Sequence, residues 1–119
     1  MRTYPLRTPS GEIYAFEVGN TLLSAAKIAR IVQTTLGAQI TYGPNRVFAR
    51  SDVRLRFMLR GVGFQVWEPF GDNSRYWVGP ESDPPTRHAS IDAIQAAIEA
   101  YEANPIQRLL SLWRRRRAA

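Results

Sequence analysis

Alternating hydrophobic and polar side chains indicate β-strands over much of the chain. Residues 12–18 alternate between two faces, and the turn signal Pro9-Ser10-Gly11 precedes them, so residues 3–18 should form a β-hairpin. Pro5 has no backbone N–H to donate, which places the first strand of this hairpin at a sheet edge. Further strands separated by short turns are expected at 39–42, 46–49, 53–60, 62–68 and 75–79.

Helical spacing of hydrophobic residues appears in three other segments. The first is residues 21–36, with Asn20 as the expected N-cap and Gly37 as the C-terminal stop. Its hydrophobic stripe is Leu22, Ala25, Ala26, Ala29, Val32 and Leu36. Ile28 lies at the border of this stripe, and Ile31 lies on the polar side. Ser90 should cap a helix over 91–103 with the stripe Ile91, Ile94, Ala97, Ile98 and Tyr101. A third helix should begin at Pro105, with the stripe Ile106, Leu109, Leu110 and Trp113.

These elements predict an α+β fold in the order β-β-α-β-β-β-β-β-α-α. Two helices should pack on one face of an antiparallel sheet of five to seven strands, and an amphipathic basic helix should follow at the C-terminus. At 119 residues the chain has the length of one domain. We expect that domain to span residues 1–113, with a basic tail over 114–119.

Composition and charge restrict the chemistry. The chain has no cysteine and one histidine, which excludes disulfides, thiol catalysis and any site with two imidazoles. Its net charge is +6. The excess cations are concentrated in residues 105–119, which hold five cations and no acid, and in the strand that carries Arg54, Arg56 and Arg60. This balance favours an anionic partner.

One face of the predicted sheet is the main candidate site. If Leu55 and Phe57 face the helices, alternation sends a set of guanidinium and indole side chains to the opposite face: Arg54, Arg56, Arg60, Trp67, Arg75 and Trp77. Arginines neutralise phosphates, and bases stack on indoles, so this face could bind single-stranded nucleic acid. The alternative is an ordinary solvated face stabilised by Arg–Trp pairs, or one covered by the C-terminal helix.

The C-terminal segment is a second candidate, because Trp113 precedes the basic run Arg114, Arg115, Arg116 and Arg117. Such a segment could attach to an anionic membrane surface or hold nucleic acid. The stripe ending at Trp113 could instead dock on another protein or on a second copy of the chain. A purely structural alternative is that cations stabilise the helix C-terminus while the stripe packs on the sheet.

Catalysis is the least favoured function. His88 has Glu81, Asp83 and Asp92 nearby in sequence, which would suffice for one acid–base pair. No second ligand follows at a metal-binding spacing, and no serine or threonine lies in a nucleophile elbow, so we expect neither enzyme activity, nor a metal, nor a cofactor.

The N-terminus lacks the apolar region of a secretory signal, and no apolar run reaches the length of a membrane span. Fifteen of the sixteen cations are arginine, a bias typical of a GC-rich bacterial genome. We therefore expect a cytoplasmic, non-enzymatic binding domain for an anionic partner, above all single-stranded nucleic acid. A protein-interaction module that uses the Trp113 helix is the alternative, and membrane attachment through the arginine tail is a third.

Overall fold

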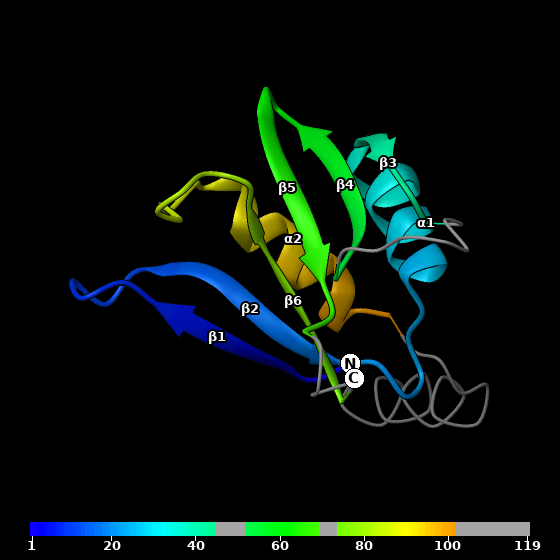
Figure 1. The fold of residues 1–119 in the computed structure, drawn as a ribbon, viewed down its shortest axis with the longest axis horizontal. Helices are drawn as coiled ribbons and strands as arrows, with labels where there is room; N and C mark the ends of the chain where they lie inside the picture. The colour runs from blue at the N-terminus through cyan, green and yellow to red at the C-terminus, as the bar shows by residue number, and fades with distance from the viewer. Residues whose placement is uncertain (45–51, 70–73, 102–119) are drawn as a thin grey trace, which may run out of the picture.

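The computed structural model describes residues 1–44, 52–69 and 74–101, which form one antiparallel sheet and two helices (Figure 1). The α+β class predicted from the sequence is therefore confirmed. The strand expected at 46–49, the third helix and the basic tail lie outside the described residues. In chain order the elements are β1 Thr3–Arg7, β2 Ile13–Gly19, α1 Ala25–Leu36, β3 Gln39–Tyr42, β4 Val53–Leu59, β5 Val62–Trp67, β6 Arg75–Pro80 and α2 Ser90–Glu99.

The described strands form a six-stranded sheet in the order β1-β2-β6-β5-β4-β3. Every neighbouring pair is antiparallel. The strand β1, with Pro5, lies at one edge, as its missing N–H predicts. The non-local step is the pairing of β2 with β6, which joins the N-terminal hairpin to the other strands. This order makes β5 and β6 the two central strands.

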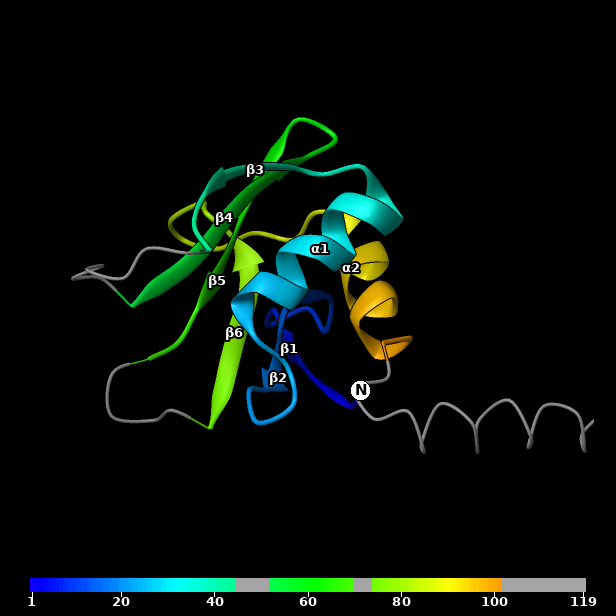
Figure 2. The ribbon, with the colours of Figure 1, turned by 90° about the vertical axis from the view of Figure 1, so that its right-hand side faces the viewer.

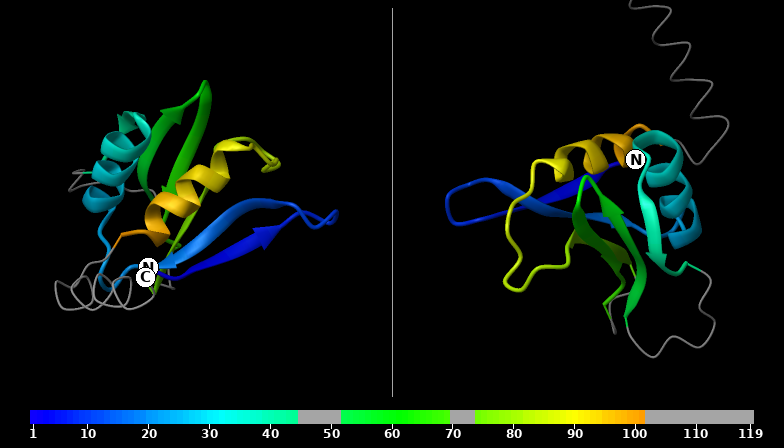
Figure 3. Two further views of the ribbon diagram at one scale, coloured as in Figure 1. Left: turned by 180° about the vertical axis from the view of Figure 1, so that it is seen from behind. Right: turned by 90° about the horizontal axis from the view of Figure 1, so that it is seen from above.

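Both helices pack on the same side of the sheet, and the core lies between them and the strands (Figure 2). In β4, Leu55, Phe57 and Leu59 are buried, whereas Arg56 and Met58 are exposed, so the predicted alternation is confirmed over this stretch. The tip of the β1–β2 hairpin projects beyond the helices (Figure 3). The fully buried core side chains include Phe16, Ile28, Val32, Leu55, Phe57, Phe64, Val66, Ile91, Ile94 and Ile98.

The first helix begins later than its sequence pattern predicts. Its N-cap is Ser24, whose hydroxyl accepts a hydrogen bond from the Lys27 backbone N–H at 3.2 Å. Asn20 instead donates its side-chain amide to Glu68, 48 residues away in sequence. Because the helix starts at Ala25, Leu22 lies before it and is 50% exposed. The predicted stop at Gly37 is confirmed, with φ at 72°.

The buried stripe of α1 is also rotated from the prediction. Ala26 is exposed, whereas Ile31, expected on the polar side, is buried. The buried residues are Ala25, Ile28, Ala29, Ile31 and Val32. This wider stripe faces both the sheet and α2, since α1 contacts both.

In α2 the N-cap is Ala89, which forms no side-chain cap. Ser90, predicted as the cap, is the first helical residue and is buried. The helix ends at Glu99, four residues before the predicted end, and Ile91, Ile94 and Ile98 form its buried stripe as expected.

The turn between β4 and β5 holds Arg60 in a strained backbone conformation, with a positive φ angle. Leu59 pairs with Val62, so Arg60 and Gly61 form a two-residue loop, and their φ angles are 51° and 77°. Both positive angles match the hairpin turn that prefers Asn-Gly. Replacing Arg60 by asparagine should therefore stabilise the protein by about 0.5–1 kcal/mol, measured by urea denaturation. Arg60→Ala removes the same charge but keeps the strain, so a gain in that variant as well would contradict this explanation.

Candidate nucleic-acid interface

The sheet face opposite the helices carries a row of side chains that crosses four strands. Tyr4 of β1 pairs with Glu17 of β2, and Glu17 pairs with Trp77 of β6. Trp77 in turn pairs with Trp67 of β5. Paired residues point to the same side of a sheet, so all four lie on this face, which we call the open face. Both described helices lie on the other side (Figure 2).

The centre of the open face is a tryptophan pair. The rings of Trp67 and Trp77 meet edge to face, with centroids 6.5 Å apart and an interplanar angle of 86°. Trp67 is 39% exposed, so a large part of its indole is accessible to a ligand. The sequence predicted that these two side chains share a face, and the register confirms that they do.

Trp77 is seated by the absence of a side chain at Gly79. A Cβ atom built on Gly79 would lie 2.5 Å from Cη2 of Trp77 and 2.8 Å from Cβ of Ala15. The indole therefore lies over the glycine, and Ala15, although on the open face, is fully buried. This packing fixes one ring of the pair and leaves Trp67 as its exposed partner.

Arg75 flanks the tryptophan pair on the β1 side. Its guanidinium carbon lies 3.7 Å from the centre of the Tyr4 ring, and Arg2 lies 5.1 Å from the same ring. The carboxylate of Glu17 is 3.8 Å from the Arg75 guanidinium. Tyr4, Glu17 and Arg2 were not predicted as site residues, although alternation in residues 12–18 already places Glu17 opposite the core.

Arg56 has matching neighbours on the β3 side. Its guanidinium carbon lies 5.7 Å from the centre of the Tyr42 ring, and Glu81 approaches it at 4.0 Å. Glu81 reaches this position because Gly63 has no side chain, since a Cβ there would lie 2.6 Å from the carboxylate. Tyr42 and Glu81 thus belong to the open face, although the sequence did not predict them as site residues.

Arg54 belongs to a different cluster. A β-bulge between Val53 and Leu55 interrupts the alternation at this residue. Its guanidinium lies 3.6 Å from Glu68, which accepts the Asn20 amide hydrogen bond. Burial raises the pKa of the Tyr76 hydroxyl, and Glu68 adds to the rise, whereas a backbone hydrogen bond at Ala25 and the Arg54 charge oppose it. Arg54 thus shares Glu68 with Asn20 in one ion-pair and hydrogen-bond cluster.

Arg60 lies in the β4–β5 turn rather than on a strand of the sheet. Of the predicted sheet-face residues, the structure brings together Arg56, Trp67, Arg75 and Trp77. Arg114, Arg115, Arg116, Arg117 and the Trp113 stripe lie outside the described residues.

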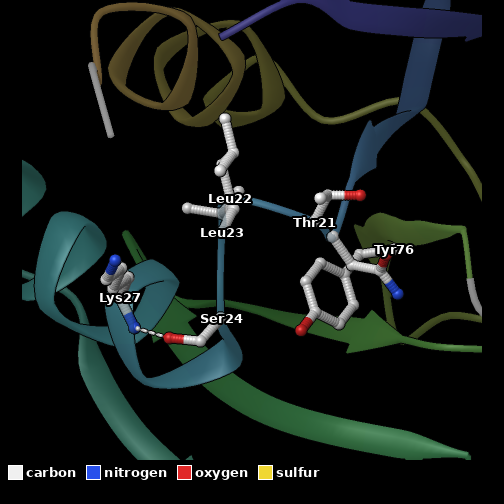
Figure 4. Close-up of a pocket in the computed structure, with 7 residues that line it drawn as sticks. Thr21, Leu22, Leu23, Ser24, Lys27 and Tyr76 are labelled. Carbon is white, nitrogen blue, oxygen red and sulfur yellow. Dashed lines mark hydrogen bonds between the residues drawn. The ribbon is translucent and has the colours of Figure 1, made fainter. Parts of the chain in front are cut away.

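A cavity of about 280 Å³ opens beside the start of α1 (Figure 4). Its lining comes from the loop after β2, the first turn of α1 and Tyr76 of β6. The polar groups at this helix start already have partners: the Ser24 hydroxyl accepts from Lys27, and Tyr76 is bonded to the Ala25 backbone. Two of the polar groups that line the cavity are thus engaged in the packing of the helix start.

The residues near His88 do not form a cluster around it. Arg87 binds both carboxylate oxygens of Asp92, at 2.7 and 3.3 Å, and this pairing lowers the pKa of Asp92. Glu81 is turned to Arg56. His88 itself lies 3.4 Å from the Thr86 hydroxyl and presents its ring at 82° to Phe64.

Neither described helix is long and apolar enough to cross a membrane. Within residues 1–44, 52–69 and 74–101, no three histidine, aspartate or glutamate side chains are grouped as a metal site requires. No protein-family model, no curated protein and no solved structure matches the chain.

Proposed function

We propose that this protein is a non-enzymatic binding domain that takes single-stranded nucleic acid on its open face. The observation that carries the proposal is the exposed Trp67 indole, held edge to face against Trp77 at the centre of a sheet face that bears no described helix. Unstacked bases bind to such aromatic platforms whatever their sequence, because each base has a π-face.

Charge supports the same ligand class. Arg75 and Arg56 lie on strands to either side of Trp67, and guanidinium groups bind phosphate through paired hydrogen bonds. The described residues hold nine cations and eight acids, whereas the whole chain carries +6, so most of the excess positive charge belongs to the remaining residues. We expect that charge to attract polyanions in general, and the open face to select single strands.

The test is a fluorescence titration with an oligodeoxythymidine of eight nucleotides. The wild-type protein should show quenched tryptophan emission, and Trp67→Ala should weaken binding about 5- to 150-fold, because stacking contributes about 1–3 kcal/mol per base. Leu22→Ala, which removes a 50% exposed apolar side chain away from the open face, should bind like the wild type.

The salt dependence of the affinity distinguishes binding by the open face from binding by the basic tail. Replacing both Arg56 and Arg75 by alanine should reduce the slope of log affinity against log salt by about 1.4, because each phosphate that an arginine neutralises adds about 0.7 to that slope. A protein that lacks residues 114–119 should still bind and still respond to Trp67→Ala. Binding that disappears with the tail but survives Trp67→Ala would overturn the proposal. The proposal would also be overturned if the wild-type protein did not bind the oligonucleotide and sedimentation showed that it self-associates through Trp67.

A further inference from the structure

The open face repeats one arrangement on both sides of the tryptophan pair. On the β1 side, Arg75 lies against the Tyr4 ring and faces Glu17 at 3.8 Å. On the β3 side, Arg56 lies near the Tyr42 ring and faces Glu81 at 4.0 Å. Each flank thus contains a tyrosine, an arginine and a glutamate, and we call these the β1-side triad and the β3-side triad.

The two ion pairs are loose. Both exceed the 3.5 Å limit of a hydrogen bond, and the four side chains are 33–48% exposed. Pairs of this kind contribute little, because water screens them and both side chains lose freedom. A tyrosine ring against a guanidinium, by contrast, orients its plane and leaves the N–H groups at its edge available to a ligand.

We propose that Glu17 and Glu81 occupy the positions that two ligand phosphates take on binding, and that the bound single strand therefore runs across the β-strands from one triad to the other. This inference rests on the proposed function, since it assumes that the ligand is single-stranded nucleic acid stacked on Trp67. A phosphate carries the same unit charge as the carboxylate it replaces and binds a guanidinium through two parallel hydrogen bonds.

The geometry of the sheet sets the path. Arg75 lies on β6 and Arg56 on β4, with β5 and Trp67 between them. Through Gln65, Arg56 is in register with Gly79, which lies four residues beyond Arg75 on β6. The path is therefore diagonal, about 10 Å across two strand spacings and about 13 Å along the strands. A ligand that contacts both arginines must pass over the indole of Trp67, which is where the base would stack.

The prediction is that removing a competing carboxylate strengthens binding. Glu17→Gln and Glu81→Gln should each tighten binding of the eight-nucleotide oligodeoxythymidine about two- to fivefold, because each frees one arginine from a weak pair. The double variant should multiply the two factors. The matched control is Glu12→Gln, which removes the same charge from the exposed loop before β2, and it should leave the affinity unchanged.

The outcomes separate this inference from the proposed function. If Trp67→Ala weakens binding but the two glutamine variants bind like Glu12→Gln or more weakly, the glutamates are not replaced by phosphates and only the exchange is wrong. If only one glutamine variant binds more tightly, the strand does not cross both triads, and the path is wrong. If the wild-type protein binds no oligonucleotide, the proposed function itself fails, whatever the variants do.

Discussion

Replacing Phe57 by alanine should lower the free energy of unfolding by about 3–5 kcal/mol, the usual cost of emptying a buried phenylalanine site. Phe57 is fully buried, and its ring stacks on Phe64 of the neighbouring strand with centroids 5.7 Å apart. Met58, the next residue, is 36% exposed on the open face, so Met58→Ala should cost less than about 1 kcal/mol. Urea denaturation of the three proteins measures both effects.

The loss expected for Phe57→Ala is large beside the total stability of a domain, which is about 5–15 kcal/mol. Phe57→Leu keeps most of the apolar volume and should remain folded at a smaller cost, which provides a second measurement if the alanine variant does not fold. Equal costs at Phe57 and Met58, or a larger cost at Met58, would show that β4 presents its other face to the helices.

Local alternation was sufficient to assign the core side of β4. Leu55, Phe57 and Leu59 are buried because a strand turns successive side chains to opposite faces, and the two described helices cover only one of those faces. The same rule failed at Arg54, where a bulge between Val53 and Leu55 adds a residue to the ladder. A bulge is a property of the pairing between two strands, so the hydrophobic pattern of one strand does not reveal it.

The start of α1 shows how long-range contacts decide between equivalent local signals. Asn20 and Ser24 are both good N-cap residues, and both precede a helical pattern. Ser24 caps the helix because the Asn20 side chain is bonded to Glu68, beyond the end of β5. The local sequence does not show that Asn20 bonds to Glu68, so the predicted start of α1 is four residues too early.

The candidate site was predicted in part for the same reason. Strand alternation placed Trp67 and Trp77 on one face because β5 and β6 are consecutive strands joined by a short connection. Tyr4 and Glu17 join them only because β2 pairs with β6, a contact between segments about 60 residues apart. Hydrophobic periodicity does not reveal which distant strands pair. The pairing of β2 with β6 brings Tyr4 and Glu17 to Arg75.

Replacing Gly79 by alanine should destabilise the protein by about 1–3 kcal/mol, the usual cost of adding atoms to a packed site. The new Cβ would lie 2.8 Å from Cβ of Ala15, which the β2 backbone holds, and 2.5 Å from the Trp77 ring. The indole must therefore move, and the tryptophan emission of the folded protein should change. Gly19→Ala is the matched control, because its Cβ would lie 3.9 Å from the nearest atom, the Ser74 carbonyl oxygen.

A double-mutant cycle tests whether Trp77 is the cause of this cost. In a Trp77→Ala background the ring is absent, so Gly79→Ala should cost less than it does in the wild type, and the remainder should reflect the Ala15 contact. Additive costs would mean that the indole is not seated on Gly79. Because Trp67 rests edge to face on Trp77, the displaced indole in Gly79→Ala should also weaken oligodeoxythymidine binding, although the substitution removes no charge and no aromatic side chain.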